Sequence, residues 1–116
     1  MYTDPDETAA LSAAERTAIL QRHESFGTET IGSGELRGAA AFEYPAKTRT
    51  IRLGAAGQGP VTTDGTLTAE AEQITGFYIL ECESLERAEQ LASGLVDAHV
   101  VAVEVRLIHD AYRLGL

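Results

Sequence analysis

Three side chains of this 116-residue chain could bind an organic acid or move a proton. His23 lies in a segment with helical periodicity, and its imidazole titrates near neutral pH, so it could act as a general base. Asp64 precedes Gly65 in an acidic turn, where its carboxylate could orient a base or accept a backbone amide as in an Asx-turn. Arg106 could clamp a substrate carboxylate with its planar guanidinium. His23 could equally be a half-buried residue with a structural hydrogen bond.

Three more residues complete the candidate ligand-binding set. Glu104 stands two positions before Arg106 on one face of a predicted strand, so the two side chains are close enough to form an ion pair. We favour a role for this pair between two subunits over a role in holding a ligand. Tyr78 could reach a cleft from its apolar strand, although an aromatic residue there is more often packed in the core. Gly65 is included because it shares the turn with Asp64.

Composition excludes several classes of function. Nine basic against eighteen acidic residues give a net charge of −9, which argues against binding nucleic acid or an anionic membrane surface. The histidines at positions 23, 99 and 109 are not clustered, so no metal or other cofactor is predicted. Cys82 is the only cysteine, which rules out an intrachain disulfide and indicates a small core residue. Without a signal at Met1–Asp6 or a long apolar run, we expect a cytoplasmic protein.

Capping residues, periodicity and turn residues predict two helices and several strands. A capping box at Ser12 and Glu15 starts the first helix, and a glycine-rich turn joins two strands into a hairpin. The predicted elements are a helix from about Ala13 to the Gly27–Gly32 region, strands at Glu35–Phe42, Thr48–Leu53, Val61–Thr63 and Gly76–Cys82, a helix after Ser84, and a strand at His99–Ile108.

This order of elements is that of an α+β sandwich, with helices on one face of an antiparallel sheet in one domain over residues 1–116. We expect the helices to cover the apolar face of the last strand, formed by Val101, Val103, Val105 and Leu107. The opposite face mixes apolar residues with the Glu104–Arg106 pair. Such a face suits a second subunit or a ligand cleft better than open solvent.

The order of several short motifs resembles that of the YCII-related proteins, in particular the branch known for a DGPF motif. The matching residues are Tyr2–Pro5, Leu11-Ser12, Thr63-Asp64-Gly65, Glu72-Gln73, Gly76-Phe77-Tyr78, Ser84-Leu85 with Ala88, and Val103–Arg106. The chain departs from that branch at Thr66-Leu67, which replaces Pro-Phe, and at Ala69 and Ala71, which replace an acid and a lysine. Leu107 replaces the proline that usually follows the final arginine.

The resemblance implies a ferredoxin-like antiparallel sheet with two helices on one face, paired into a dimeric α+β barrel whose sheets face each other. It also matches His23 to a helical histidine proposed to act with an aspartate. Relatives open with an apolar central strand, of which Met1–Thr3 is the counterpart here. We therefore expect the first strand to be missing or truncated, and the sheet to be weakened unless another segment or subunit fills the gap.

Two functions of different classes follow. The first is binding of a small organic acid or aromatic compound in a cleft near the dimer interface, lined by His23, Asp64 and Arg106, with weak or no acid–base catalysis. The second is a non-catalytic interaction module linked to an extracytoplasmic-function sigma factor, which the gene neighbourhood of the resembling branch suggests and the altered turn at Thr66-Leu67 favours. Whether the chain is an enzyme is left open by its residues, as is the identity of the ligand.

Overall fold

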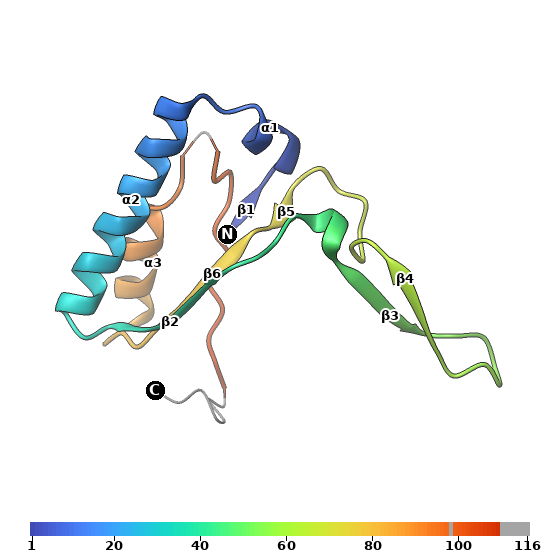
Figure 1. Cartoon of the computed structure of the whole chain (residues 1–116). Coiled ribbons are helices and arrows are strands. Elements are labelled where there is room, and N and C mark those ends of the chain that lie inside the picture. Colours follow the sequence, from blue (N-terminus) through green and yellow to red (C-terminus); the bar gives the residue numbers. More distant parts are fainter. Residues whose placement is uncertain (98, 110–116) are drawn as a thin grey trace.

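The computed structural model describes residues 1–97 and 99–109 (Figure 1). The helices are α1 (Pro5–Ala9), α2 (Ala13–Gly32) and α3 (Leu85–Ser93), with a 3-10 turn, η1 (Pro45–Lys47). The strands are β1 (Tyr2–Thr3), β2 (Leu36–Ala41), β3 (Arg49–Leu53), β4 (Pro60–Asp64), β5 (Gln73–Ile74) and β6 (Gly76–Leu80). The predicted α+β class is therefore confirmed. None of the helices described is both long enough and apolar enough to span a bilayer.

Capping residues start both long helices where the sequence predicts. At α2 the Ser12 hydroxyl accepts a hydrogen bond from the Glu15 amide. The Glu15 carboxylate accepts one from the Ser12 amide, which completes the capping box. At α3 the Ser84 hydroxyl accepts the amide of Arg87. These bonds satisfy amides that have no partner within the first helical turn, so local sequence alone sets the two starting points.

The strands form three antiparallel pairs. β2 pairs with β6, β1 pairs with β5, and β3 and β4 form the predicted hairpin. Thr75 connects the first two pairs, because its amide donates to the Met1 carbonyl at 3.0 Å while its carbonyl accepts the Phe42 amide at 2.8 Å. β5 and β6 follow each other through Thr75 as one extended segment, the β5–β6 line, and β1 and β2 lie on opposite sides of it.

The predicted strand at His99–Ile108 is wrong for most of its length. Only Ala102 forms a bridge, opposite Tyr2, whose amide donates to the Ala102 carbonyl at 2.8 Å. β1 consists of Tyr2 and Thr3 alone, and residues 103–108 pair with none of the strands described. A segment without a partner cannot form a ladder, whatever its β propensity.

The expected burial of the last apolar face is also wrong. Val103 packs against the core, whereas Leu107 is 79% exposed and Val105 is exposed as well. Val100, from the other side of the predicted alternation, is buried instead. The reason is the same, because side chains alternate cleanly between two faces only where a strand is paired on a sheet.

The core is small and lies where α2, α3 and β6 meet. Phe26 of α2 contacts Leu91 of α3 and Leu95 just beyond it, and Tyr78 of β6 packs against this cluster. The rings of Phe26 and Tyr78 lie 4.5 Å apart between centroids. Cys82 joins the edge of the cluster, as predicted, and burial raises the pKa of its thiol, which favours the protonated form at neutral pH.

The β3–β4 hairpin projects away from this core (Figure 1). Its apolar side chains are consequently open to solvent, with Ile51 68% and Leu53 87% exposed. The base of the hairpin is closed by the Gly65 amide, which donates a hydrogen bond to the Thr48 carbonyl at 2.7 Å.

Candidate functional site

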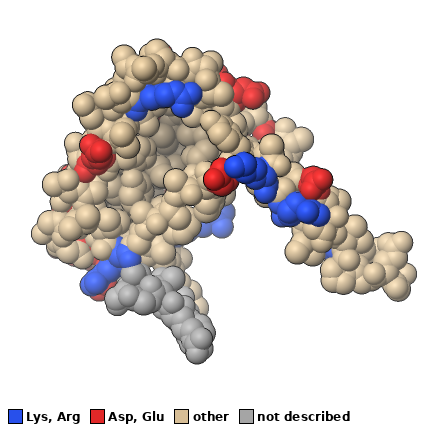
Figure 2. All heavy atoms as spheres, viewed as in Figure 1, with Lys and Arg blue, Asp and Glu red and all other residues tan. Residues whose placement is uncertain are grey.

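A cavity of about 690 Å³ opens between α2 and the β2–β6 pair, and it is the hollow near the centre of Figure 2. β2 lines it with three alanines, Ala39 to Ala41, whose small side chains leave the space between strand and helix unfilled. Ile19 and Leu20 of α2 and the rings of Phe42 and Phe77 make the rest of the wall largely apolar. Its size and its lining are typical of sites for small organic molecules.

His23 and Tyr78 form the central polar contact of this cavity. His23 Nδ1 lies 2.7 Å from the Tyr78 hydroxyl, and the two rings are stacked with 6.0 Å between centroids. His23 is one helical turn before Phe26, which directs it toward the sheet. Tyr78 lies opposite Ala39 on β6, and its ring faces α2. Both residues are half-buried.

Burial shifts the pKa values of both groups away from the charged forms. Desolvation lowers the pKa of His23 below 6.5; the Asp97 carboxylate opposes this effect and the Arg22 guanidinium adds to it. Desolvation also raises the pKa of the Tyr78 hydroxyl above 10.0. At neutral pH the cavity therefore presents a neutral imidazole hydrogen-bonded to a protonated phenol. Such a pair can accept a proton from a ligand, or donate a hydrogen bond to it.

Two further cavity residues, Arg16 and His99, were missed by sequence reasoning. Arg16 lies seven positions before His23 on the same face of α2, so its helical spacing contained the signal. His99 had no such signal, because its position depends on a turn in which the Asp97 carboxylate accepts the amides of His99 and Val100. In this turn His99 Nε2 lies 3.6 Å from the Glu15 carboxylate.

Asp64 and Gly65 lie outside the cavity. Asp64 ends β4 in the projecting hairpin, where its carboxylate pairs with Arg49 at 2.9 Å and its side chain is 87% exposed. Gly65 follows with a φ of +94°, the left-handed conformation that glycine adopts without strain. Neither residue lines the cavity that contains His23. Within a single chain, therefore, His23 and its predicted partner Asp64 do not lie in the same site.

Glu104 and Arg106 form the predicted ion pair. Arg106 Nη2 lies 2.7 Å from Glu104 Oε1, and Glu104 Oε2 accepts the Tyr2 hydroxyl at 2.8 Å. They line a second cavity of about 440 Å³, which runs between β6 and residues 103–108. Tyr78 lines both cavities. The positive charge of Arg106 is therefore already paired with a carboxylate of its own chain.

Within residues 1–97 and 99–109, no group of three or more His, Cys, Asp and Glu side chains is placed to hold a metal ion. The groups that this cavity offers for chemistry are the imidazoles of His23 and His99, the phenol of Tyr78 and the guanidinium of Arg16, around an apolar space.

Fold and cavity together define a small α+β domain with an apolar cavity between its long helix and its sheet. The chain belongs to the YCII-related domain family, whose model matches residues 1–110. It is similar to an uncharacterized protein of Rhizobium meliloti (strain 1021), with 28% identity over 98 residues, which cover 84% of this chain and 77% of that protein. The family predicted from the motifs is therefore confirmed.

Proposed function

We propose that this YCII-related domain binds a small organic acid or aromatic compound in the cavity between α2 and the sheet. The observation that carries the proposal is the 2.7 Å contact between His23 Nδ1 and the Tyr78 hydroxyl on a largely apolar wall. Apolar walls supply most of the binding free energy for such a ligand, and a few fixed polar groups orient it. Phe42 and Phe77, whose rings meet edge to face at 5.8 Å, offer an aromatic ligand a matching surface.

Catalysis in this cavity is weak or absent under the proposal. His23 is the available base, since a neutral imidazole can take a proton from a carbon or oxygen of the ligand. Stabilising the resulting anion needs a fixed positive charge or a set of hydrogen-bond donors close to the base. Asp64 and Arg106, the partners suggested by sequence, lie outside the cavity and are paired with other residues.

The proposal includes a ferredoxin-like sheet and a homodimer, with membership of the DGPF-motif branch. Residue 102, β1, the β5–β6 line and β2 follow one another across the sheet, which is the strand order that such a fold requires. The exposed apolar side chains of the β3–β4 hairpin support a second copy as their cover.

A backbone-amide NMR titration tests the proposal. The probes are a panel of small carboxylates and aromatic lactones, and the proteins are the wild type and the His23→Gln and Tyr78→Phe variants. Amides around His23, Ala39–Ala41 and Phe77 should shift with a common saturation curve. Both variants should lower the affinity for the ligand by about tenfold, or about 1.4 kcal/mol.

Arg52→Gln is the matched control, because Arg52 lies in the hairpin and its guanidinium donates to the Leu67 carbonyl. Shifts confined to the surface, or none across the panel, would contradict the proposal. Such a result would favour the interaction module instead, for which the 64% exposed Leu67 in the altered motif turn is the available contact. Binding to an extracytoplasmic-function sigma factor would then be measured directly.

A further inference from the structure

We infer that the ligand of the cavity is an elongated acid, with a carboxylate at one end, an apolar body, and a hydrogen-bonding oxygen at the other end. This inference rests on the proposed function and adds the class of ligand. Arg16 is the residue that selects the carboxylate, at the end of the cavity wall that lies two helical turns from His23.

Arg16 is a side-chain cation of the cavity wall that forms no ion pair with any described residue. The other strongly charged lining residue, Glu43, pairs with Lys47 at 3.1 Å. None of the ion pairs among the described residues includes Arg16. In a chain with a net charge of −9, a positive group at a cavity wall that pairs with none of the described carboxylates is suited to accept an anionic ligand.

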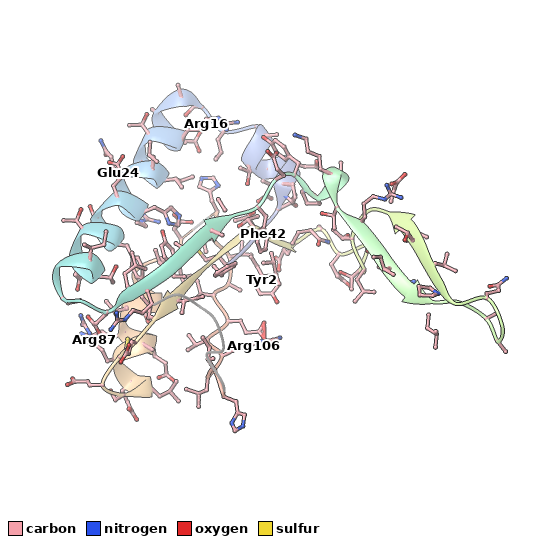
Figure 3. All side chains as sticks on the ribbon, turned by 60° about the horizontal axis from the view of Figure 1, so that its bottom comes forward. Tyr2, Arg16, Glu24, Phe42, Arg87 and Arg106 are labelled. Carbon is pink, nitrogen blue, oxygen red and sulfur yellow. The ribbon has the colours of Figure 1, made fainter. Side chains whose placement is uncertain are left out.

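The guanidinium of Arg16 is held in place without being neutralised. Its Nη2 donates to the carbonyls of Thr8 and Ala9 at 3.0 and 3.1 Å, at the end of α1. These neutral acceptors fix the side chain at the α1 end of α2, where Figure 3 labels it. An arginine has five N–H donors, so those on Nε and Nη1 are left for a carboxylate.

Helix geometry sets the length of the ligand. Arg16 and His23 are seven residues apart on α2, which places them on one face with about 10.5 Å between them along the helix axis. Between them the helix presents Ile19 and Leu20 to the cavity, and β2 presents its alanines. A ligand that contacts both polar ends is therefore elongated, with its apolar body against Ile19, Leu20 and the alanines.

Three probes test this inference: 4-hydroxybenzoate, 3-(4-hydroxyphenyl)propionate and the methyl ester of the second. The affinity of each is measured by NMR titration for the wild type and for Arg16→Gln, Arg16→Lys and Arg52→Gln. The longer acid should bind about tenfold more tightly than both its ester and the shorter acid, which corresponds to about 1.4 kcal/mol. Arg16→Gln should remove the preference for acid over ester, Arg16→Lys should restore most of it, and Arg52→Gln should leave it unchanged.

Equal binding of acid and ester to the wild type, or an acid preference that survives Arg16→Gln, overturns the inference. In that case Arg16 only caps α1, and the proposed function stands as long as shifts still converge on His23. Binding of none of the three probes near His23 overturns the inference and counts against the proposed function. Amide spectra of each variant, compared with the wild type before ligand is added, separate a loss of affinity from a loss of fold.

Discussion

At the scale of single residues, His23 links the cavity to stability through its lowered pKa. Burial disfavours the imidazolium, so the unfolded chain, with a histidine pKa near 6.5, binds this proton more readily than the native state. The free energy of unfolding should therefore fall as pH falls below about 6.5 toward the lower native pKa. His23→Gln should show a smaller decrease, because glutamine does not titrate.

Urea unfolding of the wild type and of His23→Gln at several pH values between 7.5 and 5 measures this difference. Carboxylates such as Glu35, whose pKa is lowered to about 2 by hydrogen bonds from Arg87 and Ser33, lose their contribution only at more acidic pH. They therefore do not obscure the comparison. Identical pH dependence in the two proteins would show that His23 is not held neutral by burial.

Residue pairs were predictable only where they are close in sequence. The ion pair of Glu104 and Arg106 followed from a two-residue spacing on one face. The pair of Glu35 and Arg87, whose atoms approach to 2.9 Å, joins the start of β2 to α3 across 52 positions and left no local signal. The His23–Tyr78 contact is similar: both residues were candidates, but nothing in the sequence placed them together.

At the scale of elements, the capping box makes the start of α2 sensitive to one hydroxyl. Ser12→Ala removes the acceptor for the Glu15 amide and should lower the free energy of unfolding by about 1 kcal/mol. Denaturant unfolding measures the loss. Ser93→Ala is the control, because the Ser93 hydroxyl donates to the Glu89 carbonyl within α3 and caps no helix start. An equal effect of both changes would argue against the cap.

β6 should show alternating protection of its amides. The Glu81 amide donates to the Glu35 carbonyl across β2, while the Gly76 carbonyl accepts the Met1 amino group on the other side. By alternation, Phe77 and Ile79 point their amides at β2, and Tyr78 and Leu80 point theirs at the unpaired edge. Hydrogen exchange at Tyr78 and Leu80 should therefore be at least about tenfold faster than at Phe77 and Ile79. Equal protection would mean that another strand covers this edge.

Elements that depend on local signals agreed with prediction, and those that depend on a distant partner did not. Caps and periodicity set both long helices, and a glycine-rich turn set the β3–β4 hairpin. The strand predicted at 99–108 required a neighbour, and only Ala102 has one. The strand predicted at Glu35–Phe42 is present as β2, and its three alanines leave a cavity because they have little side chain to pack.

At the scale of the whole molecule, the chain is more extended than a single compact domain. Its radius of gyration is 16.8 Å, against about 13.4 Å expected for this length. The β3–β4 hairpin, which projects from the core (Figure 1) and leaves Ile51 and Leu53 exposed, accounts for part of the difference in the radius of gyration. A homodimer that buries this hairpin would restore a compact particle, as the proposal requires.

Light scattering coupled to size-exclusion chromatography measures the oligomeric state. The wild type should elute with twice the 12.4 kDa mass of one chain. Leu53→Glu should weaken dimerisation by about tenfold or more, since it places a charge in an apolar contact. Thr63→Glu lies opposite Thr50, on the other face of the same hairpin, and is the control for added charge alone. A wild type that stays monomeric at high concentration would contradict the dimer.

We propose above all that His23 contacts a small acid or aromatic ligand in the cavity. The most direct test is to follow the imidazole nitrogens of His23 by NMR while 3-(4-hydroxyphenyl)propionate is added. We expect the ring nitrogens of His23 to shift in step with the amides of Ala39–Ala41, and Tyr78→Phe to alter this response. Unchanged His23 nitrogens alongside saturable shifts elsewhere would place the ligand outside the cavity and rule out a binding role for His23.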